Sequence, residues 1–179
     1  GCRMRSVWME GSVLPEDLTP DGAAGVPKVP VEMNGPVLVF GGCYSNLEAT
    51  VALQREATRL GIRPENIVCT GDVVAYCADP AATVELIRDW GVHVIMGNCE
   101  ESLGWSKDDC GCGFEEGTAC EQLSVDWYTY ANRALGEEPR TWMRALPRRL
   151  DIVLDDRRLA VVHGAVDSIN RFVFASTPW

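Results

Sequence analysis

Three short, mainly apolar runs, each followed by a glycine-containing turn, restrict the fold of this chain more than any other feature. They cover residues 36–41, 66–70 and 92–96. Runs of this length are typical of strands buried on both faces. Helical patterns cover residues 46–60 and 80–90. Strand–turn–helix units in succession connect by right-handed crossovers, so the three strands are predicted to be neighbours in one parallel sheet.

The remaining elements complete one α/β domain, because 179 residues are too few for two well-packed domains. Two further helices are predicted at 118–135 and 139–145. Two strands at 149–154 and 158–162 flank a natural hairpin turn.

Changes in composition suggest the domain boundaries. Residues 1–35 contain scattered Pro and Gly without a sustained period, which predicts an irregular N-terminal arm. Residues 36–179 are expected to form the domain. Within it, the Gly-rich, acidic and Cys-containing stretch at about 104–120 is expected to be a loop.

Charge and hydropathy exclude several classes of function. The formal net charge is −10, which argues against bulk electrostatic binding of nucleic acid. A small phosphorylated ligand remains compatible with this charge, because a bound metal ion can reverse the sign of a site locally. No apolar run is long enough to cross a bilayer, and the first residues show no secretion signal. A cytoplasmic protein without membrane contact is expected, and its oligomeric state is left open.

Polar side chains with the chemistry of metal ligands stand where the predicted strands end. Asp72 follows the second strand, Asn98 follows the third, and His163 follows the last. Ligands of parallel α/β sheets gather beyond the carboxyl ends of the strands. Carboxylate, amide and imidazole groups suit divalent first-row metals. The pattern predicts that the three side chains converge on a metal. The alternatives are a solvated turn carboxylate, a helix cap and a hydrogen-bonded histidine.

Three motifs resemble those of the calcineurin-like metallophosphoesterases. Residues 71–80 (GDVVAYCADP) look like the family's second metal motif, and residues 97–100 (GNCE) resemble its Gly-Asn-His-Asp/Glu motif. Residues 162–164 (VHG) are similar to the later His motif. The order and spacing agree over residues 36–170. The resemblance implies an α/β fold, a β-sandwich flanked by helices, with the site at the strand ends.

The chain also departs from the family pattern. Where the family has Asp-x-His-Gly-Asn, residues 42–46 are GCYSN, so both metal ligands of that motif are missing. The final Gly-His-x-His motif is missing too, which suggests a fold incomplete at the C-terminus. Transfer of the remaining motifs leaves Asp72, Asn98 and His163 as ligands of one metal, with Mn, Fe, Zn and Ni all open.

The resemblance implies hydrolysis of a phosphomonoester or a phosphodiester, that is, a phosphatase or phosphodiesterase acting on a small substrate. Asn46, from the altered first motif, is expected to bind phosphate or orient water, and Cys99 stands at the position of the catalytic His. Two alternatives stay open. One is a catalytically silent relative that uses the cleft for binding, and the other is a scaffold repurposed around a cysteine-bound cofactor.

The second alternative depends on a group of cysteines among the eight in the chain. Cys110, Cys112 and Cys120 have a C-x-C…C spacing, and Cys99 is close enough in sequence to join them. Four thiolates suit Zn or an iron–sulfur cluster. The other interpretation is an unligated loop in which the thiols are free or occasionally oxidised.

Overall fold

The computed structural model describes residues 29–114 and 117–178, and its centre is a parallel sheet. The sheet has the order β2-β3-β4, formed by Leu38–Phe40, Ile67–Cys69 and His93–Val94. Both pairings are parallel, with Leu38 opposite Ile67 and Val68 opposite His93. The predicted parallel sheet is confirmed, although each strand is shorter than the apolar run that predicts it.

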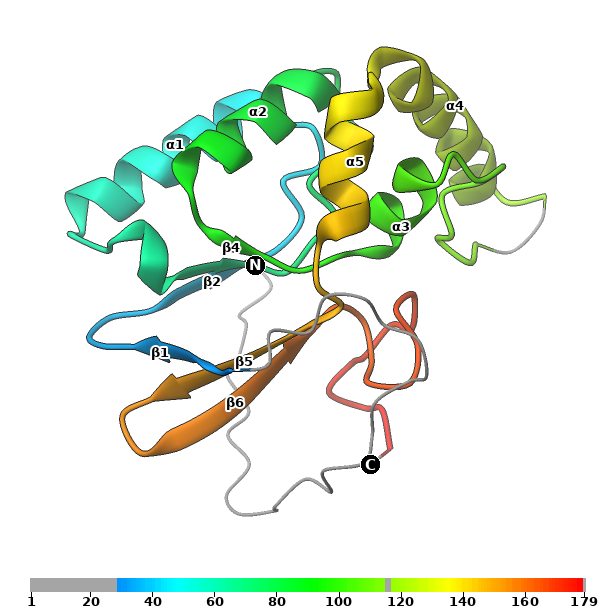
Figure 1. Ribbon diagram of the computed structural model, residues 1–179. Coiled ribbons are helices and arrows are strands. Elements are labelled where there is room, and N and C mark those ends of the chain that lie inside the picture. Colours follow the sequence, from blue (N-terminus) through cyan, green and yellow to red (C-terminus); the bar gives the residue numbers. More distant parts are fainter. Residues whose placement is uncertain (1–28, 115–116, 179) are drawn as a thin grey trace.

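A second sheet lies against the first and makes the fold a sandwich (Figure 1). Its order is β1-β5-β6, formed by Val31–Met33, Arg149–Leu154 and Arg157–Val162. Strands β5 and β6 form the predicted antiparallel hairpin, and β1 pairs with β5 in parallel. Apolar side chains from both sheets fill the space between them: Met33, Val68, Ile95, Leu150 and Ile152.

Strand β1 corrects the prediction of an arm that is irregular throughout residues 1–35. Residues 31–33 extend along β5, where their backbone groups find partners and Met33 is buried between the sheets. The pairing is to a strand more than a hundred residues later, so no local pattern signals it. The rest of the predicted arm, residues 1–28, lies outside the described residues.

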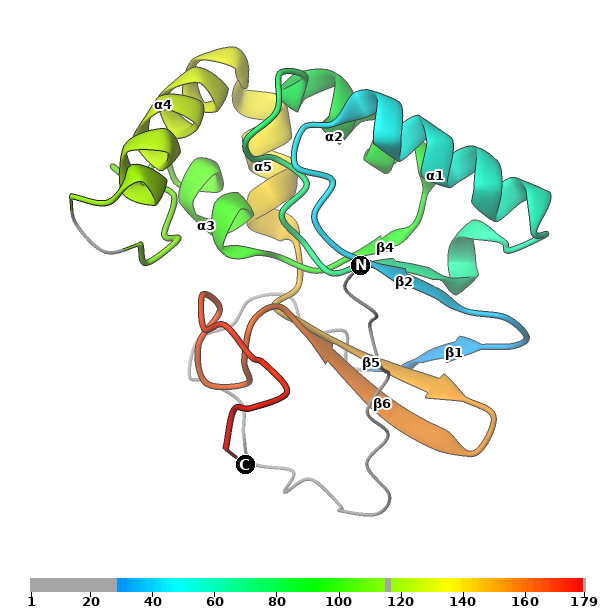
Figure 2. The same ribbon diagram turned by 180° about the vertical axis from the view of Figure 1, so that it is seen from behind.

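The helices gather on the face of the first sheet that is turned away from the second sheet, as both views show (Figures 1 and 2). They are α1 (Leu47–Arg59), α2 (Pro80–Trp90), α3 (Asn98–Gly104), α4 (Ala119–Ala134) and α5 (Glu137–Ala145), with a one-turn 3-10 helix, η1 (Pro64–Asn66). A second apolar core lies beneath them. Among the described residues, no helix has both the length and the apolar character needed to cross a membrane.

Local signals explain most helix ends. The side chain of Asn46 accepts the N–H of Ala49 (3.0 Å) and caps α1, as its position predicts. Pro80 occupies the first turn of α2, and Gly91 ends this helix with a φ of 73°. Thr118 caps α4 through Glu121 N–H.

Among the described residues, α3 is the one α-helix that the sequence analysis does not predict. This short helix is stabilised by α5, because side chains of α5 donate hydrogen bonds to its last carbonyl oxygens. Arg140 donates to Leu103 O (2.5 Å) and Arg144 donates to Gly104 O (2.6 Å). This packing matters for the site, since α3 begins at Asn98.

Candidate metal centre

Three loops from two different sheets bring Asp72, Asn98 and His163 together. Asp72 lies in the turn after β3, Asn98 begins α3 after β4, and His163 follows β6. His163 Nε2 lies 3.2 Å from Asn98 Oδ1 and 3.5 Å from Asp72 Oδ2. The geometry therefore meets the first requirement of a shared metal site, which is convergence of the ligand atoms.

The tautomer of His163 follows from its second contact. His163 Nδ1 lies 2.6 Å from Thr70 O, and a carbonyl oxygen only accepts, so Nδ1 carries the proton. In the neutral ring Nε2 is then unprotonated. Its lone pair faces two oxygen atoms, Asp72 Oδ2 and Asn98 Oδ1, that also lack a proton. A cation among the three atoms, or a second proton on His163, resolves this repulsion.

Asn98 is oriented by its amide nitrogen. Its Nδ2 donates to Cys110 O (3.1 Å), which turns Oδ1 toward His163. The three donor atoms are thus a carboxylate oxygen, an amide oxygen and an imidazole nitrogen, a set that fits a divalent first-row metal. Over residues 29–114 and 117–178, no three His, Cys, Asp or Glu side chains gather around one point. A metal held here therefore depends on Asn98 as its third ligand.

Glu100 supports the Asp72 turn and is a functional residue that the sequence analysis does not identify. Its fully buried carboxylate accepts the N–H groups of Asp72 (2.8 Å), Val73 (2.8 Å) and Gly97 (2.9 Å). Burial and the nearby charge of Asp72 raise the pKa of Glu100 to about 7. The available signal is an acid at the third position of a helix, where it can bond back to the helix start.

Two glycines allow the β3 and β4 turns to approach each other closely. A Cβ at Gly71 would lie 2.6 Å from Gly97 N, and a Cβ at Gly97 would overlap Asp72 Oδ1. Asp72 itself has a φ of 53°, in the left-handed region that non-glycine residues seldom adopt. The Glu100 bond to its N–H stabilises this conformation, which aims the carboxylate toward His163.

Gly42 and Tyr44 stand at the positions where the first motif of the family has its two metal ligands. A Cβ added at Gly42 would overlap the ring of Tyr44, so the ring occupies the space where a side chain at position 42 would begin. Tyr44 N–H donates to Asp72 O (3.1 Å), which fixes this turn beside the β3 turn. The space beside Asp72 is therefore filled by an aromatic ring rather than by a second set of metal ligands.

Asn46, a predicted catalytic residue, has a structural role that explains its position. Its side-chain oxygen is used by the N–H of Ala49 at the start of α1. Its backbone carbonyl accepts the hydroxyl of Thr50 (2.7 Å). Both contacts belong to the beginning of the helix.

The four cysteines that the sequence analysis offers as a possible cluster do not converge, and the alternative of a partly oxidised loop fits the structure better. Cys110 and Cys112 are joined in a disulfide, while Cys120 is exposed at the start of α4. Gly111, with a φ of 65°, lets the chain fold back so that the two flanking sulfur atoms meet. Cys99 is buried beside Asn98, whose Nδ2 lies 3.6 Å from its sulfur. Among the described residues the arrangement does not support a Zn or iron–sulfur site built on these four thiolates.

Burial also determines the chemistry of Cys99. The pKa of the Cys99 thiol is raised well above its ordinary value by burial, with the charges of Asp72 and Glu100 acting in the same direction. The thiol is therefore protonated at neutral pH, and Asp72 Oδ1 accepts the backbone N–H of Cys99 (3.3 Å). The residue at this position can donate a hydrogen bond but does not supply a thiolate nucleophile.

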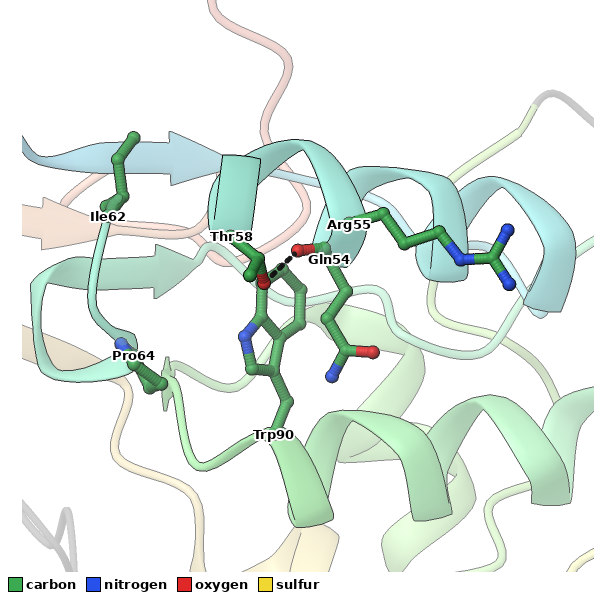
Figure 3. Close-up of a pocket in the computed structure, with 6 residues that line it drawn as sticks. All are labelled: Gln54, Arg55, Thr58, Ile62, Pro64 and Trp90. Atoms are coloured by element: carbon green, nitrogen blue, oxygen red, sulfur yellow. Dashed lines mark hydrogen bonds between the residues drawn. The ribbon is translucent and has the colours of Figure 1, made fainter. Parts of the chain in front are cut away.

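A surface hollow of about 330 Å³ lies away from this centre (Figure 3). It is lined by Gln54, Arg55, Thr58, Ile62, Pro64 and Trp90. These residues belong to the last turns of α1 and α2 and to the loop before β3, so they lie at the amino ends of the strands. The hollow does not contact Asp72, Asn98 or His163 and has no part in the candidate site.

The sandwich, with its candidate ligands at the strand ends, is typical of a metallophosphoesterase. Residues 35–178 match the model of the calcineurin-like phosphoesterase family, and the chain belongs to that family. Members of this family use divalent metal ions and act on phosphoesters. The predicted family and fold are confirmed.

Individual relatives resemble this chain in sequence or in fold. Uncharacterized protein MJ0912 from Methanocaldococcus jannaschii is 40% identical over 62 residues, 35% of this chain and 25% of that protein. Hypothetical protein PH1004 from Pyrococcus horikoshii OT3 superposes with a TM-score of 0.63 at 21% identity, covering 82% of this chain and 61% of that one. A metallophosphoesterase from Sphaerobacter thermophilus superposes with a TM-score of 0.55 at 22% identity, covering 77% of this chain and 51% of that one. The chain thus spans only part of the length of each relative.

Proposed function

We propose that this protein hydrolyses a small phosphomonoester or phosphodiester with a single divalent metal ion held by Asp72, Asn98 and His163. The observation that supports the proposal most is the position of His163 Nε2, which lies close to the oxygens of Asp72 and Asn98 while Nδ1 is fixed by Thr70. A histidine oriented by a backbone carbonyl is the usual arrangement of a metal ligand.

Some side chains of the site are proposed to bind the metal ion, and others hold the binding residues in position. A divalent ion at this position would neutralise charge on the phosphoryl oxygens and activate water for attack on phosphorus. Asp72 supplies the negative charge that holds the ion, and Glu100 keeps the Asp72 turn in place through its backbone N–H groups. Cys99, with its thiol protonated, can donate a hydrogen bond toward the site. Asn46 is assigned to the cap of α1.

A second candidate function is phosphate or metal binding without turnover. It is favoured by one specific observation, the replacement of the first-motif ligands by Gly42 and a Tyr44 ring that covers it. A complete two-metal clamp stabilises both the attacking and the leaving oxygen. Among the described residues no group of three His, Cys, Asp or Glu side chains is placed to hold a metal, so Asp72, Asn98 and His163 are candidate ligands for one ion at most. The expected turnover is accordingly low.

Metal binding and hydrolysis separate the two candidates. We expect purified protein to bind one equivalent of Mn²⁺ and to hydrolyse p-nitrophenyl phosphate or bis-p-nitrophenyl phosphate only in its presence. His163→Ala should remove both properties. The matched control is His93→Ala, because His93 is the only other histidine and its Nε2 contacts Glu65 O (3.1 Å), away from the site. Stoichiometric binding without hydrolysis would favour the silent binding protein, and the absence of both Mn²⁺ binding and phosphate binding would refute both candidates.

A further inference from the structure

Two exposed tyrosine rings lie side by side next to the candidate metal centre. Tyr44 follows β2 and Tyr76 lies in the loop between β3 and α2. Their ring centroids are 5.1 Å apart, with the planes inclined by 53°. Tyr44 is 39% exposed and Tyr76 is 52% exposed. Paired aromatic surface of this kind is available to a ligand without any rearrangement of the fold.

The two rings are held by the same loops that form the site. Tyr44 N–H donates to Asp72 O (3.1 Å), and Tyr44 O accepts Cys77 N–H (3.1 Å). Tyr76 also packs edge-on against Trp127 of α4, with centroids 5.4 Å apart. Trp127 is only 8% exposed, so it acts as a fixed support behind Tyr76. Both tyrosine rings are therefore ordered before any ligand arrives, which lowers the entropy lost on binding.

The phenol groups of both tyrosines have raised pKa values. Burial raises the pKa of Tyr76 to about 12, and the charge of Asp72 acts in the same direction. The pKa of Tyr44 is raised by burial and by Asp72. Both phenols therefore stay neutral at physiological pH, and they border the same carboxylate that is proposed to hold the metal.

We propose that Tyr44 and Tyr76 form a stacking subsite for an aromatic ring on the substrate, so that the substrate class is a nucleoside phosphate or an aryl phosphate rather than an aliphatic phosphoester. This inference rests on the proposed function, since the phosphoryl group is placed at Asp72, Asn98 and His163. The ring of the substrate packs on the tyrosine pair while its phosphate reaches the metal. Stacking on aromatic side chains tolerates different rings because every base has a π-face.

Binding of matched ligands tests the subsite independently of turnover. Calorimetry in Mn²⁺ compares phenyl phosphate with methyl phosphate, and adenosine 5′-monophosphate with ribose 5-phosphate. We expect the aromatic member of at least one pair to bind about tenfold more tightly, the size of one stacking contact. Preference in the first pair alone indicates an aryl phosphate, and preference in the second indicates a nucleotide. Equal affinity within both pairs would overturn the subsite.

Variants link the preference to the two rings. Tyr76→Asn and Tyr44→Asn remove a ring, and asparagine tolerates the positive φ at both positions. Each should reduce the aromatic preference, whereas Tyr76→Phe keeps the ring and should retain it. Phe172→Leu alters another exposed aromatic pair, formed with Phe174, and should leave the preference unchanged. Loss of preference in Phe172→Leu but not in the tyrosine variants would refute the assignment.

Failure of the proposed function gives a different result. Methyl phosphate and ribose 5-phosphate carry no aromatic ring, so their binding reports on the metal centre alone. If their binding requires Mn²⁺, the metal centre stands whatever the aromatic ligands do. If they show no Mn²⁺-dependent binding while an aromatic ligand still binds through Tyr44 and Tyr76, the tyrosine subsite stands and the metal proposal fails.

Discussion

The turn after β2 and the turn after β3 share a backbone framework but differ in chemistry. Gly42 N–H donates to Gly71 O and Tyr44 N–H donates to Asp72 O, both at 3.1 Å, so the two turns run side by side. The β3 turn presents a carboxylate to His163, whereas the β2 turn presents an aromatic ring. Backbone pairing needs only N–H and C=O groups, so the first motif has lost its ligands without losing its scaffold.

The two turns also differ in how they are held. The β3 turn is anchored by the buried carboxylate of Glu100, which accepts successive backbone N–H groups. The β2 turn is anchored by the hydroxyl of Ser45, which accepts Ala75 N–H (3.2 Å). A buried carboxyl group that accepts several N–H groups is a stronger constraint than a hydroxyl that accepts one. The turn that keeps its candidate ligand is thus also the more strongly fixed one.

Asp72→Asn is expected to have the largest effect of these changes, because it removes the carboxylate that distinguishes the β3 turn from the β2 turn. Asparagine keeps the shape and the hydrogen-bonding reach but loses the charge that holds a divalent cation. We expect Mn²⁺ affinity in equilibrium dialysis to fall by more than about 100-fold, beyond the loss typical of residues that only orient a metal ligand. Hydrolysis of aryl phosphates should disappear with it. Undiminished hydrolysis would show that the reaction takes place elsewhere.

Glu100→Ala tests the anchor of the same turn. The change leaves several buried N–H groups without an acceptor, so we expect the free energy of unfolding in urea to fall by about 3 kcal/mol. The matched control is Glu101→Ala, the next residue of α3, whose carboxylate lies 3.2 Å from Lys107 Nζ and also pairs with Arg148 nearer the surface. Each of these two ion pairs should contribute less than about 1 kcal/mol. Equal losses in the two variants would contradict the anchoring role.

Gly42→Asp examines whether the β2 turn can regain a ligand. A side chain at this position overlaps the Tyr44 ring, so we expect a loss of about 2 kcal/mol in unfolding free energy. The double change with Tyr44→His removes the ring, and its loss should be smaller than the sum of the single losses. A gain of a second Mn²⁺ equivalent in the double variant would show that the scaffold still accepts two metals. A single variant as stable as the wild type would disprove the overlap.

Asn46→Ala gives the smallest expected effect and separates capping from catalysis. Loss of the cap should lower the unfolding free energy by about 1 kcal/mol, and Asn46→Ser should restore most of it because serine also caps helices. Turnover per folded molecule should be unchanged in both variants. A stable Asn46→Ser protein with reduced turnover would instead assign the amide group to substrate binding.

Much of the local structure could be predicted from the sequence. The apolar runs mark the strands of the first sheet, and Asn46 and Pro80 mark the starts of α1 and α2. Signals of this kind involve residues within one or two turns of each other, so they are visible in a linear chain. Helix α3 has one local signal, Glu100 at its third position, and part of what holds this helix comes from arginines of α5 about forty residues later.

The cysteines show where spacing alone misleads. The C-x-C…C pattern is compatible with a metal cluster, yet only Cys110 and Cys112 meet, and Cys120 points to solvent. Whether thiols converge depends on the loop conformation, here on the left-handed Gly111, and on how α4 packs. Sequence spacing sets neither of these.

The sequence by itself determined the parallel sheet, the family motifs and the positions of Asp72, Asn98 and His163 at strand ends, because hydrophobic period and glycine placement are local properties. Only the tertiary structure decided how these residues meet. His163 bonds to Thr70, 93 positions earlier, because β6 belongs to a second sheet that packs against the first. The Tyr44 ring over Gly42 and the Glu100 anchor under Asp72 are likewise consequences of packing between segments distant in sequence.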